Sequence, residues 1–307
     1  MQSLIIGSGL IGLFAKEMIG GNILPFNKSR YFSFTPSLAD DFIKCDSDID
    51  GIVNNLHRSI PIFHKLAFSL KGTLITEPEA TIVEAYLNKA YNGSPPFLAD
   101  VMMKKMGFFT HGTSCGKLYE LLLRKHNQNI HDSVGKYGRL LKIKPHVAVC
   151  ERANIEFDTA ISTIPLDVLC KLAGISVELH SGPIYYYHIK TGALNFEGAD
   201  QVLVTDQHID FFKVSKISDI DYVFWSPREI EMAHSYFGAF MNKFSLDNIT
   251  HIQNVIPFPK EPHSKPPDLD WLWNDYGIHC VGSNAQWDDL MDVSSCLKRL
   301  QRLAKTP

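Results

Sequence analysis

The Gly-x-Gly-x-x-Gly turn formed by Gly7, Gly9 and Gly12 constrains the fold more than any other feature of the sequence. An apolar run at residues 3–6 precedes the turn, and residues 13–19 follow it with apolar side chains at helical spacing. This order predicts a strand, a tight turn and a helix, the arrangement that binds the pyrophosphate of a dinucleotide. An α/β fold is therefore expected.

Each glycine of this turn has a separate physical role. Gly7 permits the tight turn, Gly9 lets a phosphate approach the backbone, and Gly12 lets the helix pack closely on the strand. The phosphates would lie on free N–H groups at the positive end of the helix, so Leu10 and Ile11 are candidate cofactor-binding residues as well. The alternative is a glycine-rich turn without a ligand, and the flanking strand and helix argue against it.

The second strand, expected at residues 23–26, lacks the acid that usually binds the adenosine ribose. That acid lies about 20 residues beyond the first glycine, but Asn27 stands there, and no acid occurs between Glu17 and Asp40. The side-chain carbonyl of Asn27 can accept a hydrogen bond from a ribose hydroxyl, and Lys28 or Arg30 would favour a nearby phosphate. Asn27 and Lys28 are therefore predicted to contact the cofactor.

A second glycine turn lies near the end of the chain. Residues 279–281 predict a short buried strand that ends at Gly282 and Ser283, and an amphipathic helix follows from about residue 290. If this helix only closed the core, its apolar stripe would be explained, but the glycine at position 282 would not. The repeated order of strand, glycine turn and helix predicts a second cofactor-binding segment.

Four segments, in this order along the chain, resemble the flavin-binding parts of FAD-dependent oxidoreductases. The most similar group contains the amine oxidases, protoporphyrinogen oxidases and UDP-galactopyranose mutases. The segments are residues 7–12, 109–124, 157–166 and 281–292. Their combination is more specific than any one of them alone.

The resemblance implies a Rossmann-like FAD-binding domain assembled from residues 1–38, 107–172 and 270–307. A smaller α+β substrate domain, made of residues 39–106 and 173–269, would be inserted into it. The resemblance also implies cofactor contacts in the later segments, at Thr163, Gly282, Ser283, Met291, Asp292 and Val293.

Trp287 lies beside the C-terminal glycine turn, where stacking near the flavin and packing in the core are equal alternatives. In the inserted segments, periodicity predicts helices at residues 52–70 and 77–91. It predicts strands at residues 183–189, 201–205, 209–214 and 222–225.

The sequence contains no P-loop, zinc-site spacing, Ser-His-Asp signature or His-Glu-x-x-His motif. Such motifs are not required when a flavin accepts the hydride. The weak catalytic candidates are Tyr185, Tyr187 and His188 in an aromatic strand, where Tyr185 and Tyr187 share one face and His188 lies on the other. Core packing of this strand is the favoured alternative.

By resemblance, the chain is expected to oxidise an amine or amino-acid-like group by hydride transfer to flavin N5. The amine could be a small molecule or part of a larger one, such as a modified nucleobase. A flavin isomerase similar to UDP-galactopyranose mutase is less supported, because Arg228 is the only arginine between residues 175 and 256 to clamp a diphosphate. A noncatalytic dinucleotide-binding protein is the third alternative.

Composition limits the partners and the location. The chain has 307 residues, with 30 Lys and Arg against 33 Asp and Glu, so no global basic field attracts nucleic acid. The longest apolar stretch, residues 4–14, is broken by glycines and is too short to cross a bilayer. The six cysteines are scattered without a Cys-x-x-Cys pair, which indicates free thiols, no metal site and a cytoplasmic location.

Overall fold

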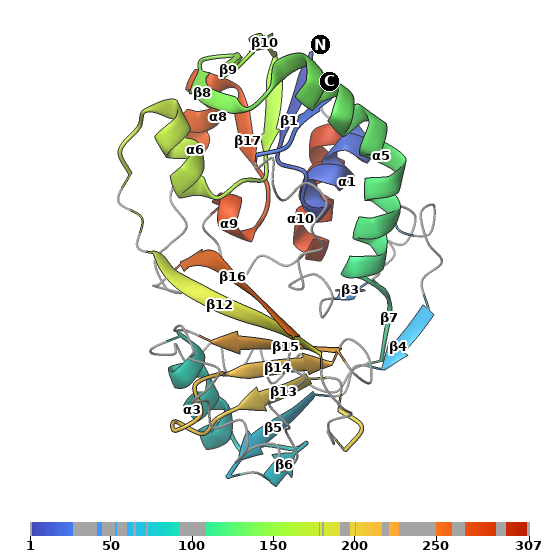
Figure 1. The fold of residues 1–307 in the computed structure, drawn as a ribbon, viewed down its shortest axis with the longest axis vertical. Helices are drawn as coiled ribbons and strands as arrows, with labels where there is room; N and C mark the ends of the chain where they lie inside the picture. Colours follow the sequence, from blue (N-terminus) through green and yellow to red (C-terminus); the bar gives the residue numbers. More distant parts are fainter. Residues whose placement is uncertain are drawn as a thin grey trace.

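The molecule has two parts (Figure 1). One is built on a four-stranded parallel sheet and the other on a seven-stranded, mostly antiparallel sheet. The computed structural model describes residues 2–26, 42–44, 53, 60–63, 66–71, 73–91, 109–177, 179, 181–190, 197–199, 201–216, 221–226, 250–259, 268–286 and 293–305. Asn27, Lys28, Trp287, Met291 and Asp292 therefore lie outside the described residues.

Four parallel strands form the centre of the first part, in the order β17-β11-β1-β2. Ser3 pairs with Thr159 and Ala160 pairs with Ile278, so segments far apart in the sequence lie side by side. The α/β fold with a parallel sheet is confirmed. The strands are β1 (Ser3–Ile6), β2 (Asn22–Leu24), β11 (Thr159–Ser162) and β17 (Ile278–Cys280).

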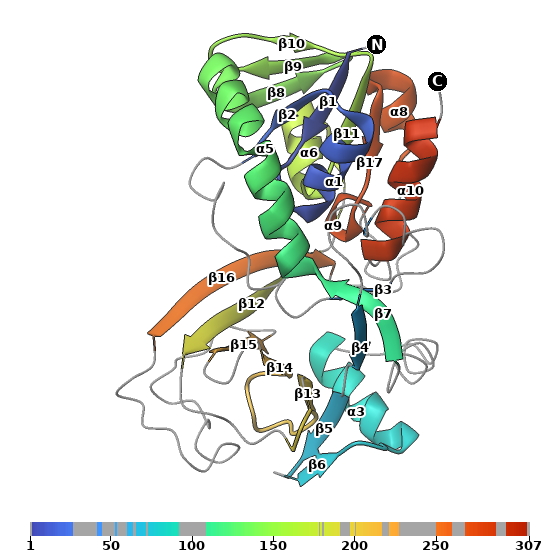
Figure 2. The same ribbon diagram turned by 90° about the vertical axis from the view of Figure 1, so that its right-hand side faces the viewer.

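Alternating side chains of β1 bury both faces of this sheet. Ile5 packs on one face with α1 (Leu10–Ile19), α5 (Cys115–Tyr137) and α10 (Val293–Lys305). Leu4 and Ile6 pack on the other face, which is covered by three antiparallel strands and two helices (Figure 2). These elements are β8 (Leu140–Lys144), β9 (Val147–Cys150), β10 (Ile155–Glu156), α6 (Leu166–Ala173) and α8 (Asp270–Tyr276).

The second part is a seven-stranded sheet in the order β16-β12-β15-β14-β13-β5-β6. Helix α3 (Ala80–Tyr91) covers one face, where Tyr86 meets the ring of Phe68 edge-on. The strands are β5 (Leu66–Leu70), β6 (Thr73–Ile75), β12 (Ser181–Lys190), β13 (Gln201–Val204), β14 (Lys213–Lys216), β15 (Asp221–Ser226) and β16 (Thr250–Pro259).

A short sheet and a long helix connect the two parts (Figure 2). Strand β7 (Phe109–Ser114) pairs with β3 (Phe42–Lys44) and β4 (Ile60–Phe63), and it leads directly into α5. The exact division of the chain into two domains stays a prediction. No helix in the described ranges combines the length and apolar character that a membrane span needs.

The helix predicted at residues 52–70 is wrong in its second half, where β4 and β5 are found. Apolar side chains occur there at a spacing that suits either structure. Pairing decides the outcome, because β5 fits between β13 and β6, with Leu66 opposite Gln201. The helix predicted at residues 77–91 is confirmed as α3, which begins at Ala80.

Candidate functional site

The N-terminal glycine turn is anchored on β2. Gly7 has φ +111°, a conformation that side chains rarely allow, and its N–H donates to the carbonyl oxygen of Leu24 at 2.8 Å. A Cβ atom at Gly7 would overlap the hydroxyl of Thr163, and one at Gly12 would overlap the carbonyl oxygen of Gly7. Gly7 is therefore required both by its backbone conformation and by the lack of room for a side chain. Gly12 is required by the lack of room alone.

Gly9 differs, because it faces open space. It has an ordinary φ of −68°, and no described atom lies within 4 Å of the position that its Cβ would occupy. It is also the N-cap of α1, and no side chain of the described residues caps it by a hydrogen bond. The backbone N–H groups of the first turn of α1 have no partner within the helix, so they are available to bind an anion.

Thr163 supports this turn from the adjacent strand. Its N–H donates to the carbonyl oxygen of Ile6 at 2.9 Å, and its hydroxyl donates to the same oxygen at 3.2 Å. Thr163 therefore ties the residue after β11 to the end of β1, directly behind Gly7. Its contact with a cofactor stays a prediction.

The C-terminal glycine turn lies at the same edge of the sheet. Val281 donates through its N–H to the carbonyl oxygen of Ser162 at 2.9 Å, and Gly282 then turns the chain with φ +129°. The short helix α9 (Ser283–Gln286) follows, closed by a bond of 2.9 Å from the Gln286 N–H to the Gly282 carbonyl. Both turns thus follow the carboxyl ends of parallel strands, where α/β folds bind ligands.

Two buried polar side chains belong to the same region. Ser162 is fully buried at the end of β11, and Gln286 is 7% exposed in α9. Neither the hydroxyl of Ser162 nor the side-chain oxygen of Gln286 has a hydrogen-bond partner among the described residues. Buried polar atoms normally have partners. Ser162 ends β11 and Gln286 ends α9, at the edge of the sheet where the two glycine turns lie, so a polar ligand bound there would supply partners.

Val293 begins α10, and its half-buried side chain packs with the core beneath α1. As the first residue of α10, Val293 has its backbone at the positive end of the helix dipole, and this helix contacts α1. Ser283 begins α9. The predicted cofactor contacts of both residues stay predictions.

The aromatic strand β12 does not bring its three candidates into a described site. Tyr187 is 1% exposed and packs with Tyr222 and Phe224, so core packing holds at this position. Tyr185 and His188 take their places in the backbone ladder opposite Ser226 and Val223, and their side chains are not among those described.

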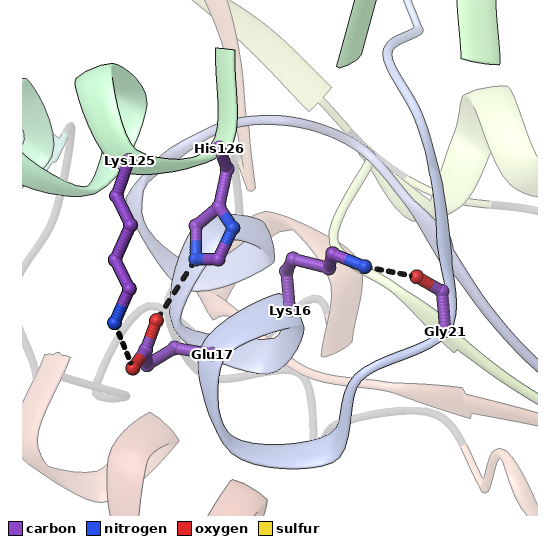
Figure 3. Close-up of polar contacts among 5 residues, drawn as sticks. All are labelled: Lys16, Glu17, Gly21, Lys125 and His126. Carbon is purple, nitrogen blue, oxygen red and sulfur yellow. Dashed lines mark hydrogen bonds and ion pairs between the residues drawn. The ribbon is translucent and has the colours of Figure 1, made fainter. Parts of the chain in front are cut away.

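An ionic cluster that the sequence did not reveal holds the C-terminal end of α1. Glu17 binds the Nζ of Lys125 at 2.6 Å through one oxygen and the Nε2 of His126 at 2.9 Å through the other (Figure 3). Burial raises the pKa of Glu17, but the hydrogen bonds and charges of Lys125 and His126 outweigh it, so the net pKa is below its usual value. Lys16 donates to the carbonyl oxygen of Gly21 nearby.

The five described cysteines are buried thiols. Burial and the neighbouring Cys170 raise the pKa of Cys280, beside the C-terminal turn, to about 12. Burial and Asp167 raise the pKa of Cys170 to about 11. Across the described residues, no group of three His, Cys, Asp or Glu side chains is arranged to hold a metal ion.

Solved structures share the architecture of the whole chain. Reduced UDP-galactopyranose mutase superposes with a TM-score of 0.65 at 10% identity, covering 99% of this chain and 93% of the other. A protoporphyrinogen oxidase-like protein from Exiguobacterium sp. 255-15 gives 0.59 at 10% identity, covering 99% and 98%. The chain has the fold of these two proteins.

A third structure, aklavinone-11 hydroxylase in complex with FAD and aklavinone, gives a TM-score of 0.57 at 12% identity and covers 99% of this chain and 61% of the other. No family model matches the sequence, and no curated protein shows a significant sequence match to it. The likeness is therefore one of fold.

Proposed function

We propose that this protein is an FAD-dependent oxidoreductase. The observation that carries the proposal is the pair of glycine turns at one edge of the parallel sheet, with an open backbone position at Gly9 and unpartnered polar atoms at Ser162 and Gln286. The fold shared with flavoproteins supports the same conclusion.

The residues of the two turns would divide the binding of the cofactor between them. The N–H groups at the start of α1 would hold the pyrophosphate, because they carry the positive end of the helix dipole. The turn at Gly282 would lie on the ribityl side, and the polar atoms of Ser162 and Gln286 would gain partners. Bound FAD would supply the hydride acceptor.

The N-terminus of α10, at Val293, would stabilise negative charge on the reduced cofactor. The resemblance of residues 7–12, 109–124, 157–166 and 281–292 to the amine oxidase group supports an amine or amino-acid-like substrate, either small or part of a larger molecule.

The decisive experiment is the visible absorption spectrum of the natively purified protein, with identification of any chromophore released by heat. We expect a flavin spectrum and FAD as the released compound. A colourless protein that takes up no added FAD would contradict the proposal.

The substrate class has a separate test. Amines added to the holoprotein without oxygen should bleach the flavin absorbance, and oxygen or another acceptor should restore it. If dithionite reduces the flavin but no amine bleaches it, the amine substrate is rejected and the assignment as a flavoprotein remains. Conversion of UDP-galactopyranose by the reduced protein without net oxidation would instead indicate a mutase.

A further inference from the structure

Phe26 is an exposed aromatic residue next to the proposed cofactor site. Among the described residues, three large apolar side chains are well exposed: Phe26 at 38%, Leu141 at 51% and Trp273 at 42%. Leu141 lies on β8 and Trp273 on α8, which packs on a face of the sheet. Of the three, Phe26 is the one that follows the carboxyl end of a parallel strand.

The backbone fixes Phe26 beside the N-terminal glycine turn. The ladder between β1 and β2 ends where Ile6 pairs with Leu24, whose carbonyl oxygen accepts the N–H of Gly7 at 2.8 Å. Pro25 follows and is buried; it has a fixed φ and no N–H to continue the ladder. The chain therefore passes from a buried strand to an exposed ring within two residues of the bond to Gly7.

The order of the strands decides which half of a dinucleotide meets Phe26. The N-terminal glycine turn, which would hold the pyrophosphate, follows β1. The Gly282 turn follows β17, two strands away on one side. Strand β2 is the neighbour of β1 on the opposite side and forms the edge of the sheet. An FAD molecule that runs from the Gly282 turn across the N-terminal glycine turn would therefore place its adenosine at the end of β2.

We propose that the ring of Phe26 stacks on the adenine base of the cofactor and supplies binding energy in a site that lacks the usual ribose-binding acid. The sequence between Glu17 and Asp40 has no carboxylate to bind the ribose hydroxyls. An aromatic ring offers a stacking surface that every base can use, and the loss of such a ring weakens binding by about tenfold or more. This inference rests on the proposed binding of FAD.

The test measures FAD dissociation by dilution of the holoprotein, followed by the fluorescence of the released flavin. Phe26→Ala should raise the dissociation constant about tenfold. Phe26→Leu, which keeps apolar bulk but no ring, should weaken binding to a similar extent. Phe26→Trp should retain the wild-type constant. Leu141→Ala, at an exposed apolar residue on another sheet, is the matched control and should leave the constant unchanged.

Phe26→Trp also gives a readout that a structural role would not move. Its added emission should be quenched when FAD binds, beyond the change seen in the wild-type protein. If Phe26→Ala or Phe26→Leu binds FAD as tightly as Leu141→Ala, Phe26 does not contact the adenosine. If the wild-type protein binds no FAD, the proposed function fails and this inference fails with it.

Discussion

The carbonyl oxygen of Gly7 fills the space that a side chain at Gly12 would need. The first turn of α1 therefore packs directly against the loop that precedes it. Gly9 lies between these two glycines, yet its missing side chain leaves space that no described atom occupies. Within one motif, packing requires glycine at Gly12, whereas no described atom would contact a side chain at Gly9.

Replacing Gly9 should therefore affect the ligand and not the fold. Gly9→Val is expected to abolish FAD retention while the melting temperature of the ligand-free protein stays close to that of the wild type, because φ at Gly9 is ordinary. Gly135→Val is the control, since Gly135 lies on α5 and also has no described atom within 4 Å of its Cβ position. Full flavin occupancy in Gly9→Val would contradict the position of the pyrophosphate.

Replacing Gly12 should have the opposite effect. The side chain of Gly12→Val must displace the Gly7 carbonyl or the whole of α1, and overpacking of this kind costs about 1–3 kcal/mol. Urea unfolding of the ligand-free protein should therefore show a clear loss of stability. An unchanged unfolding midpoint would mean that α1 does not pack against Gly7 as described.

The hydroxyl of Thr163 should contribute to stability through Ile6. Thr163→Val keeps the shape of the side chain but removes the hydrogen bond of 3.2 Å, with an expected loss of about 0.5–1.5 kcal/mol. Thr163→Ser keeps the hydroxyl and should lose less. The comparison is made by chemical denaturation, and equal losses in the two variants would assign the effect to packing alone.

The Glu17 cluster should stabilise the protein in a pH-dependent manner. The pKa of Glu17 is lower in the folded state, so its contribution is present above the unfolded-state value of 4.5 and is lost as the pH falls through the folded value. The difference in unfolding free energy between wild type and Glu17→Gln should be at most about 1 kcal/mol near neutral pH, because Lys125 is exposed.

Denaturation curves at a series of pH values, from neutral to below the folded-state pKa, test this dependence. The difference between the two proteins should shrink below pH 4.5. A difference that grows on acidification would have the wrong sign for a carboxylate with a lowered pKa.

Cys280 should be inert towards alkylation in the folded protein. Burial and Cys170 raise the pKa of this thiol to about 12, so its reactive thiolate is scarce near neutral pH. Iodoacetamide should leave Cys280 unmodified in buffer and label it in urea, as read by peptide mass spectrometry. Rapid labelling under native conditions would show that β17 opens readily.

Local patterns were sufficient to predict the two glycine turns and α3. Each glycine turn lies between a short strand and a helix. The strand, the turn and the helix are each determined by residues that are close together in the sequence. The same approach failed at β5, because its conformation depends on Gln201 and its neighbours, far along the chain. Helix α5 also extends to Tyr137, beyond the resembling segment 109–124, and its buried positions include the polar residues His126 and Ser133, which interrupt the apolar stripe.

The polar atoms of the candidate site were beyond prediction for a related reason. Ser162 and Gln286 are single polar residues with no pattern around them. They belong to β11 and α9, which are far apart in the sequence. The Glu17 cluster likewise joins residues of α1 and α5 that have no relationship in the sequence.

The strand order β17-β11-β1-β2 also determines when the protein can mature during translation. Strand β1 leaves the ribosome before its neighbour β11, which follows only after the long β7–α5 segment, and β17 and α10 are synthesised later still. Until then, Leu13 and Phe14 of α1 lack the helix that packs against them. A nascent chain must therefore reach α10 before the core beneath α1 can close, and a premature stop in α10 would leave the apolar side chains of α1 exposed and prone to aggregation.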